Sequence, residues 1–251
     1  MYREYARHYD QGQLHFSVLM FDYLQDVLER HAPSQHSVVD LACGTGTLAL
    51  MLADLGWDVL GIDQARDMLH EAQRKARHRL DPTRSIRFRR ADMRDWHISQ
   101  PVGLVTCFYD SVNYLLEEDD LKATFQCVWN ALDDQGLWIF DINTPYFLEH
   151  VWQPVEIEER DGYAHIMQTT FNSNRCLSTL TMTGFYQRED GLYERFVENH
   201  AERGYEREIL AQLLTDVGFT IEAVYECFVF SEPTPQSHRW LWVCRKGRRQ
   251  N

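Results

Sequence analysis

The segment that most restricts how this chain can fold is a strand-to-helix turn between Asp40 and Gly46. The apolar run Ser37–Cys43 has the pattern of a buried strand and stops at Gly44, and leucines then recur at helical spacing from Leu48 to Leu55. A buried strand that passes through glycines into a helix begins a crossover between parallel strands. This turn alone favours an α/β fold.

The same alternation continues along the first part of the chain. Two amphipathic patterns, over residues 65–80 and 121–132, predict helices between short apolar runs. The strands predicted after the first are Trp57–Ile62, Ser85–Ala91, Gly103–Tyr109 and Leu137–Ile142. Five strands joined by crossover helices indicate a mostly parallel, doubly wound, Rossmann-like sheet.

Beyond Pro145 the pattern changes to that of hairpins. Turn signals separate β-rich runs between Val155 and Arg203, at Asp161-Gly162, Asn172-Ser173-Asn174 and Asp190-Gly191. We therefore expect a small antiparallel sheet inserted after the fifth strand of the parallel one.

The two ends of the chain complete the predicted architecture. A helical pattern over 209–217 precedes strands at Phe219–Phe230 and His238–Cys244, which we expect to pair antiparallel at the edge of a seven-stranded sheet. The first ~35 residues are interpreted as helical, with one apolar stripe formed by Val18, Phe21, Leu24 and Leu28. The resulting division is 1–148 for the N-terminal arm and cofactor-binding core, 149–204 for the insertion, and 205–251 for the last helix and strands.

The charge balance argues against a nucleic-acid partner. The chain has 25 Lys and Arg against 38 Asp and Glu, a formal charge of −13, which repels phosphate backbones over most of the surface. One stretch, Arg74–Arg94, is instead strongly basic, with only Asp81 and Asp92 opposing it. Charge runs usually lie on solvated faces, so we interpret this stretch as a wet helix end and edge strand.

Hydrophobicity and cysteine spacing indicate the cellular compartment that we expect for the protein. No apolar stretch approaches the roughly 18–20 residues that a bilayer requires, and Met1–Tyr5 opens a polar segment. The six cysteines form neither a C-x-x-C pair nor a metal-ligand spacing with histidine. We expect a cytoplasmic protein with reduced, mostly packed thiols, no metal and no membrane partner.

The turn after the first strand has the features of a nucleotide-cofactor site. Glycines at 44 and 46 let a ligand approach the backbone, and the helix that follows offers unpaired N–H groups. Asp63 ends the second strand 23 residues after Asp40, where its carboxylate can accept hydrogen bonds from ribose hydroxyls.

The same turn leaves the identity of the cofactor open between two classes. Residues 44–49 also satisfy the G-x-G-x-x-G/A pattern of dinucleotide-binding proteins. Asp40 argues against that class, because its carboxylate repels a pyrophosphate but attracts an ammonium group. S-adenosylmethionine has an ammonium group and a ribose, and it has no phosphate.

The segment Asp40–Gly46, followed by Asp63 and Ala91-Asp92-Met93, resembles the class I S-adenosylmethionine-dependent methyltransferases, and the resemblance extends over nearly the whole chain. The family motif is acid-x-Gly-x-Gly-x-Gly, and Ala42 stands here at its first glycine. Alanine at this position is common in the small-molecule branch of the family. In many members an antiparallel lid over the acceptor follows strand five, which matches the predicted insertion.

The resemblance implies a role for each cofactor-side residue. Asp63 would bind the ribose, Met68 and Met93 would contact the adenine, and Asp92 would accept a hydrogen bond from its amino group. The segment Tyr5–Asp10 resembles the N-terminal helix whose tyrosine, here Tyr9, touches the methionine end; simple packing of that aromatic ring is the alternative. The complete predicted cofactor set is Tyr9, Asp40, Ala42, Cys43, Gly44, Gly46, Asp63, Gln64, Met68, Asp92, Met93 and Phe108.

The acceptor side is less defined. Segment 108–114 resembles the family's acceptor-side motif, and 140–143 its fifth-strand ending. A hydroxyl acceptor needs a general base, for which Asp110 and Tyr109 are the candidates, with His165 or His200 from the lid. Asp110 could instead form an Asx turn or a helix cap, and the histidines could be ordinary strand residues.

Aromatic and methionine side chains of the lid could line an acceptor pocket. Strand side chains alternate, so only about half of them would face it. The candidates are Met167, Phe171, Met182, Phe185, Tyr186, Tyr193 and Phe196.

The leading hypothesis is methyl transfer from S-adenosylmethionine to a small-molecule acceptor, at nitrogen or oxygen. The alternatives are an RNA methyltransferase, supported only by the basic stretch, a nicotinamide-dependent oxidoreductase, and a subunit that binds S-adenosylmethionine without turnover. The sequence names neither the acceptor nor the oligomeric state.

Overall fold

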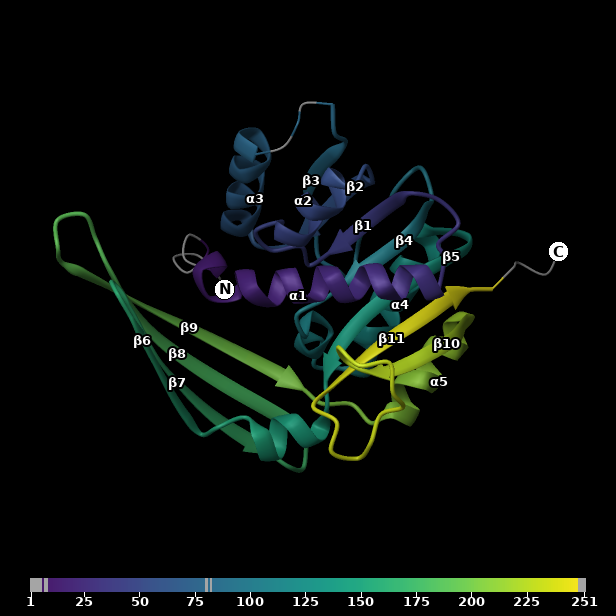
Figure 1. Ribbon diagram of the computed structural model, residues 1–251. Helices are drawn as coiled ribbons and strands as arrows, with labels where there is room; N and C mark the ends of the chain where they lie inside the picture. Colours follow the sequence, from purple (N-terminus) through teal and green to yellow (C-terminus); the bar gives the residue numbers. More distant parts are fainter. Residues whose placement is uncertain (1–5, 7–8, 80, 82, 248–251) are drawn as a thin grey trace.

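A seven-stranded sheet forms the centre of the molecule (Figure 1). The computed structural model describes residues 6, 9–79, 81 and 83–247. The strands of this sheet, in chain order, are β1 (Ser37–Leu41), β2 (Asp58–Asp63), β3 (Ile86–Arg90), β4 (Val102–Cys107), β5 (Leu132–Asn143), β10 (Phe219–Glu226) and β11 (Arg239–Lys246). Their spatial order is β10-β11-β5-β4-β1-β2-β3. The predicted doubly wound, mostly parallel sheet is confirmed.

The strand directions follow from the connections. β1 to β5 pair parallel with one another, whereas β11 pairs antiparallel with both β5 and β10. The predicted pairing of the last two strands is confirmed, but only β10 is an edge, because β11 lies between β10 and β5. Leu132, predicted to end a helix, begins β5 instead, since its backbone is extended and it pairs with Val102.

Helices cover both faces of this sheet. α4 (Glu118–Ala131) and α5 (Arg207–Val217) pack on one face, where the core contains Phe125, Trp138 and Leu214. α1 (Tyr9–Arg30) and α2 (Thr47–Asp54) cover the other, and α3 (Arg66–Arg79) contacts β2 and β3 near the cofactor turn. Leu80, predicted on the α3 stripe, lies outside the described residues.

The N-terminal helix is present, but its buried face differs in part from the predicted stripe. Met20, Leu24 and Val27 are buried, whereas Val18 is 39% exposed. Phe21 and Leu28 are partly buried against the core. The stripe is shifted because α1 packs on α2 and on the sheet at once. Tyr5, Arg7 and His8 of the predicted N-terminal segment lie outside the described residues.

A separate four-stranded antiparallel sheet follows β5, as predicted. It contains β6 (Val155–Arg160), β7 (Tyr163–Asn172), β8 (Leu177–Gln187) and β9 (Tyr193–Arg203), and the short π-helix η3 (Phe147–Val151) leads into it. Figure 1 shows this sheet, called the lid below, extending from the core past the N-terminal end of α1. The residue ranges proposed as domains remain a prediction.

One face of the lid is buried, and strand alternation decides which side chains it carries. Buried positions occupy alternate residues, including His165 on β7, Met182 on β8 and His200 on β9. Tyr9 packs against a small apolar cluster on this face, which contains Met182 and Phe196. The lid and the first turn of α1 are thus in contact.

Two further features concern exposure. Within the described residues, no helix has both the length and the apolar character needed to cross a bilayer. All six cysteines are free; Cys107, Cys227 and Cys244 are buried and the other three are partly buried. This agrees with the predicted packed thiols.

Candidate active site

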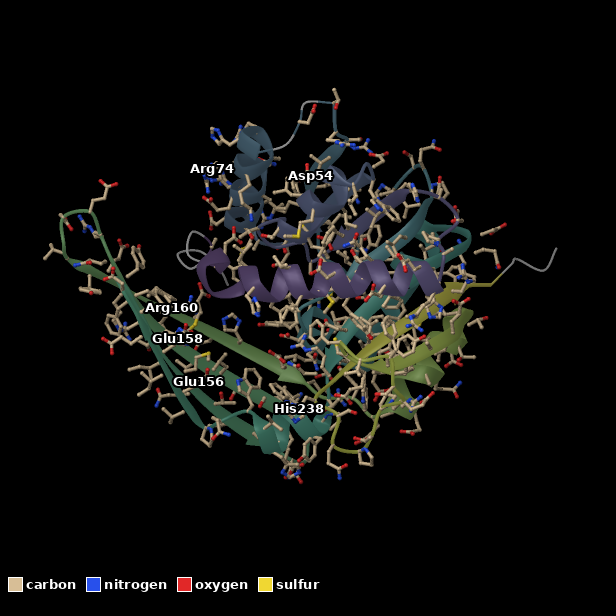
Figure 2. All side chains as sticks on the ribbon, in the orientation of Figure 1. Asp54, Arg74, Glu156, Glu158, Arg160 and His238 are labelled. Carbon is tan, nitrogen blue, oxygen red and sulfur yellow. The ribbon has the colours of Figure 1, made fainter. Side chains whose placement is uncertain are left out.

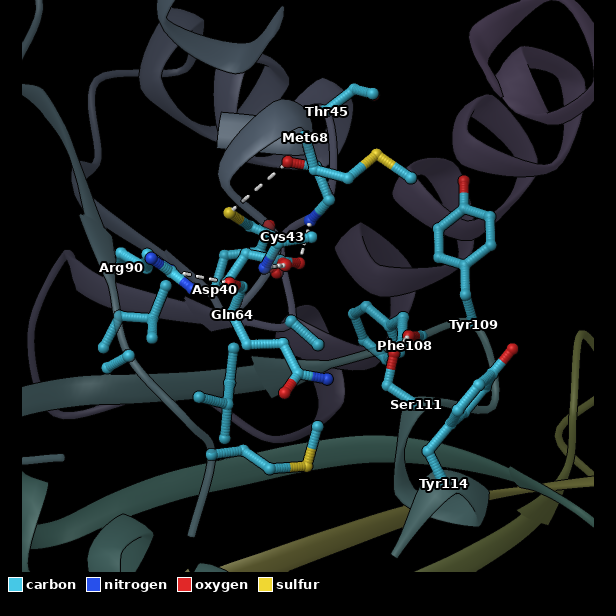
Figure 3. Close-up of a pocket in the computed structure, with 18 of the residues that line it drawn as sticks. Asp40, Cys43, Thr45, Gln64, Met68, Arg90, Phe108, Tyr109, Ser111 and Tyr114 are labelled. Carbon is cyan, nitrogen blue, oxygen red and sulfur yellow. Dashed lines mark hydrogen bonds between the residues drawn. The ribbon is translucent and has the colours of Figure 1, made fainter. Parts of the chain in front are cut away.

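The carboxyl ends of β1 to β4 open into a cavity of about 750 Å³ (Figure 3). Ligands of open α/β sheets bind at this edge. All predicted cofactor-binding residues except Gly46 line the cavity, and of the two strand-end candidates for a general base Tyr109 lines it and Asp110 does not. The predicted residues in the lining are Tyr9, Asp40, Ala42, Cys43, Gly44, Asp63, Gln64, Met68, Asp92, Met93, Phe108 and Tyr109. The structure therefore brings together residues from five separate stretches of the chain.

The two glycines of the turn serve different purposes. Gly44 has φ +54, and a Cβ built on it would meet no atom within 4 Å, so its backbone faces open space in the cavity. Gly46 has φ +73, and a Cβ there would lie 2.9 Å from Ala72 Cβ and from the ring of Phe88. Gly46 thus allows close packing of α2 on its neighbours, while Gly44 leaves room for a ligand.

Asp63 is held by the turn that it faces. Its Oδ2 accepts a hydrogen bond from Gly44 N at 2.8 Å, and its Oδ1 accepts one from Ala65 N at 2.7 Å. Burial raises the pKa of Asp63, while these backbone donors act in the opposite direction. Each carboxylate oxygen has a second lone pair, so the group can still accept hydrogen bonds from a ligand.

Asp40 is a buried carboxylate on the cavity wall. It is 3% exposed, and its Oδ1 accepts a hydrogen bond from Thr106 Oγ1 at 2.8 Å. Burial raises its pKa to about 7, and the nearby charge of Asp63 contributes in the same direction. A cationic group in the cavity would favour the ionised form of Asp40 and offset part of its burial cost.

Asp92 and Met93 lie at the end of the cavity beside β3. Asp92 accepts hydrogen bonds from the guanidinium of Arg94, at 2.9 Å from Nε and 2.7 Å from NH2. The hydrogen bond with Arg94 lowers the pKa of Asp92. The carboxylate is therefore ionised at neutral pH and fixed in orientation, as a hydrogen-bond acceptor should be.

A buried lysine holds the cofactor turn through hydrogen bonds, and the sequence pattern did not identify it as a site residue. Lys75, interpreted as part of a solvated basic run, is 3% exposed. Its Nζ donates to Asp10 Oδ2 at 2.6 Å, Thr47 Oγ1 at 2.7 Å and Thr45 Oγ1 at 3.1 Å. The prediction was wrong for Lys75, because it follows Met68 and Ala72 at helical spacing and so shares the buried face of α3.

The rest of the basic stretch agrees better with the solvated interpretation. Arg74 pairs with Glu71, Arg87 with Asp58, and Arg94 with Asp92 and Asp120, all with partly or fully exposed side chains. Figure 2 shows Arg74 on the outer side of α3. Carboxylates of the protein itself thus pair with these three arginines, whereas Arg89 and Arg90 donate to the backbone oxygens of His97 and Gln64.

The acceptor-side end of the cavity is lined by hydroxyl groups. Ser17, Tyr109, Ser111 and Tyr114 all lie there, and Figure 3 shows the last three together across from Asp40. Ser17 Oγ and Tyr109 Oη are hydrogen-bonded. Burial raises the pKa of the Tyr109 phenol, so it is neutral at physiological pH and is better suited to orienting an acceptor than to removing its proton.

Asp110 lies outside the cavity lining and has a different partner. It accepts a hydrogen bond from Arg239 NH2 at 2.8 Å, and Arg239 NH1 donates to Asp141 Oδ2 at 2.5 Å. Asp110 occupies the N-cap position of the 3₁₀ turn Ser111–Tyr114, but its side chain makes no capping hydrogen bond there. A general-base role for Asp110 stays a prediction, and this ion pair favours a structural role.

The lid residues lie beside the cavity rather than in its lining. His165 Nδ1 lies 3.1 Å from Tyr163 Oη, whereas His200 Nδ1 lies 3.1 Å from Tyr114 Oη. His200 thus contacts a cavity residue directly. Of the predicted acceptor-pocket side chains, Met167, Phe171, Met182, Tyr186 and Phe196 share the buried face, and Phe185 and Tyr193 alternate to the other.

The residues of the cavity fit S-adenosylmethionine. The ammonium group suits the buried Asp40, the ribose suits Asp63, and the bare backbone of Gly44 leaves space between them. A doubly wound sheet with this carboxylate arrangement and an inserted lid defines a class I S-adenosylmethionine-dependent methyltransferase.

Comparisons with known proteins give the same class. Residues 38–136 match the family described as "Methyltransferase domain". The chain is 32% identical over 83% of its length to a putative methyltransferase of Geobacillus sp. (strain WCH70), covering 84% of that protein. This chain therefore belongs to the class I S-adenosylmethionine-dependent methyltransferase family, and it is an enzyme that uses this cofactor.

Two other relatives extend the comparison. The crystal structure of an S-adenosylmethionine-dependent methyltransferase from Clostridium acetobutylicum superposes with a TM-score of 0.87, at 27% identity, covering 98% of this chain and 99% of that one. A dTDP-3-amino-3,6-dideoxy-alpha-D-glucopyranose N,N-dimethyltransferase from Streptomyces fradiae is 32% identical over 41% of this chain and 38% of its own length. Membership of this family overturns the alternative of a nicotinamide-dependent oxidoreductase.

Proposed function

We propose that this enzyme methylates a small-molecule acceptor, at nitrogen or oxygen, in the cavity above β1 to β4. The observation that carries the proposal is the presence in one cavity of the buried carboxylate of Asp40 and the partly buried carboxylate of Asp63, which accepts a hydrogen bond from the backbone N–H of Gly44. They fix one end of the cofactor and leave the hydroxyl-lined end of the cavity for an acceptor.

The individual roles follow from the geometry and the resemblance. We assign Asp63 to the ribose hydroxyls, Asp40 to the ammonium group, and Asp92 to the adenine amino group. Met68 and Met93 provide the apolar contacts of the adenine. Tyr9 closes the cavity from the first turn of α1, where it also touches the lid.

The chemistry asks little of the protein beyond alignment. S-adenosylmethionine supplies a methyl group that its sulfonium already makes electrophilic. The chain's residues orient the acceptor lone pair and exclude water, which is the contribution expected from Tyr9, Tyr109 and the lid. The two tyrosines, with Ser17 and Tyr114, can hydrogen-bond an acceptor that bears an amine or a hydroxyl group.

Charge and likeness both favour a small acceptor over RNA. The formal charge is −13, and three arginines of the basic stretch, Arg74, Arg87 and Arg94, are paired with carboxylates. The Streptomyces fradiae relative is named for an amino sugar nucleotide, a small amine. We carry that class to this chain as a proposal.

Calorimetry and a transfer assay test the proposal. S-adenosylhomocysteine should bind the wild type, and Asp63→Ala should weaken binding by at least tenfold. Asp58→Ala is the matched control, because Asp58 begins the same strand but its side chain pairs with Arg87. Radiolabelled methyl transfer should then be measured to 3-amino-3-deoxyglucose, to catechol and to transfer RNA. Transfer to RNA alone would reject the small-molecule acceptor.

A further inference from the structure

Tyr114 and His200 connect the cavity to the lid. Tyr114 ends the 3₁₀ turn η2 (Ser111–Tyr114) and lines the cavity, as Figure 3 shows. Its Oη lies 3.1 Å from His200 Nδ1, and the two rings meet edge-on at 89°. His200 lies on β9, 86 residues further along the chain.

The surroundings of His200 make it able to receive a proton. The ring is 7% exposed, and burial lowers its pKa, so the imidazole is neutral at physiological pH and one of its nitrogens is a hydrogen-bond acceptor. The carboxylates of Glu198 and Asp110 act on its pKa in the opposite direction. Glu198 is buried and lies on the same face of β9. These charges stabilise an imidazolium once it forms.

We propose that Tyr114 and His200 form a proton-accepting pair for the methyl acceptor. The Tyr114 oxygen accepts a hydrogen bond from the acceptor's N–H or O–H group. As the acceptor lone pair forms the new bond to the methyl carbon, that proton moves to the Tyr114 oxygen and the phenol proton moves to His200 Nδ1. The methyl–sulfur bond breaks, its electron pair stays on sulfur, and the net proton rests on the imidazole.

The proposed pair rests on the proposed function, and its two residues have different roles. Tyr114 touches the acceptor and is the catalytic residue, whereas His200 acts through it as a positioning and proton-receiving residue. Because His200 is carried by the lid, the pair is complete only when β9 lies against η2. The lid thereby contributes to the chemistry as well as to the walls of the site.

Nitrogen NMR of the wild-type protein tests the geometry without any acceptor. With ¹⁵N-labelled histidine, the His200 signals can be assigned from their loss in His200→Asn. The proposal requires the Nε2–H tautomer, with Nδ1 unprotonated and accepting from Tyr114, and it requires Nδ1 to shift in Tyr114→Phe. A His200 ring with its proton on Nδ1 would overturn the proposal, whichever acceptors the enzyme uses.

Kinetics with 3-amino-3-deoxyglucose test the proton transfer. His200→Ala should lower kcat by about 100-fold, in the range of general acid–base catalysis. His200→Asn keeps an acceptor near the position of Nδ1 but takes up no proton, so it should keep KM within threefold while kcat stays low. His165→Ala is the matched control, because this lid histidine is also buried but is hydrogen-bonded to Tyr163, which does not line the cavity. It should keep at least half of the wild-type kcat.

The outcomes separate the pair from the function on which it rests. Recovery of kcat in His200→Asn, or a wild-type kcat in His200→Ala, would overturn the proton transfer. Binding of S-adenosylhomocysteine by all variants, within threefold of the wild type, shows that their cofactor site is folded. If the wild type transfers no methyl group to any small acceptor, the proposed function fails, and the tautomer measurement still decides whether the pair exists.

Discussion

Lys75 Nζ lies 2.6 Å from Asp10 Oδ2 and joins the first turn of α1 to the cofactor turn through the hydroxyls of Thr45 and Thr47. The two partners differ in exposure: the side chain of Lys75 is 4% exposed and that of Asp10 is 34% exposed. The pair therefore holds a buried cation against a carboxylate that water can still reach. Since Tyr9 precedes Asp10, the same contact also positions the cavity wall formed by Tyr9.

This asymmetry predicts unequal effects of removing either partner. Asp10→Asn removes the carboxylate that lies 2.6 Å from the buried ammonium and should lower the free energy of unfolding by about 3 kcal/mol. Lys75→Met leaves Asp10 able to hydrate and should cost clearly less. Urea denaturation of both variants and of the double variant measures this, and the double variant should resemble Lys75→Met. Equal losses in the two single variants would contradict the prediction.

Alanine substitution of the two glycines of the turn should affect different properties, mainly stability at Gly46 and mainly ligand binding at Gly44. Both have positive φ, so each substitution carries strain of roughly 1–2 kcal/mol. Gly46→Ala adds a clash with Ala72 and Phe88 and should be the more destabilising of the two in thermal denaturation. Gly44→Ala meets no protein atom and should instead weaken S-adenosylhomocysteine binding by at least tenfold, because its methyl group occupies ligand space. A Gly44→Ala variant with wild-type affinity would contradict the assignment of that space.

How much of the site was visible in the sequence depended on the separation of the residues. The turn at Asp40–Gly46 and the strand ending at Asp63 are set by local patterns, so the fold and the cofactor wall could be predicted. Lys75 and Asp10 are 65 residues apart, and Arg239 and Asp110 are 129 apart. Such partners meet only through the packing of whole elements, which local periodicity does not specify.

The lid shows the same limit in another form. Its hairpin turns are local signals, and they correctly predicted an antiparallel sheet. The face that each side chain occupies depends on register, and a shift of one residue reverses it. Hence His200, Phe185 and Tyr193 could be named as candidates, but their facing could not be assigned.

Arg239 should prove more important for stability than Asp110. Asp141 is fully buried, and Arg239 is its charged partner, so Arg239→Met leaves a buried carboxylate uncompensated and should cost about 3–5 kcal/mol at pH 8. Asp110→Asn removes a partly exposed charge and should cost less. Burial already raises the pKa of Asp141 to about 6.

The pH dependence checks this interpretation. Without Arg239 the pKa of Asp141 should rise further, because the guanidinium opposes its elevation. Protonation then relieves the buried charge in the variant, so its deficit in melting temperature relative to wild type should shrink as the pH falls from 8 to 5. A deficit that is constant across this range would mean that the loss comes from packing rather than charge.

Asp40 should make cofactor binding depend on pH. Its folded-state pKa of about 7 exceeds its ordinary value of 3.8, so the folded protein binds more protons than the unfolded chain between these values. The contribution of Asp40 to the free energy of unfolding therefore falls as the pH rises from about 4 to 7. An ammonium group bound beside Asp40 favours the ionised form, so binding of S-adenosylhomocysteine should release a proton near pH 6.

The affinity of the protein for S-adenosylhomocysteine should rise with pH by up to about tenfold per unit below 7 and level off above. Calorimetry in buffers of different ionisation enthalpy measures both effects, and Asp40→Asn should bind weakly with no such slope. A wild-type affinity that is flat between pH 5.5 and 7.5 would remove Asp40 as the partner of the ammonium group.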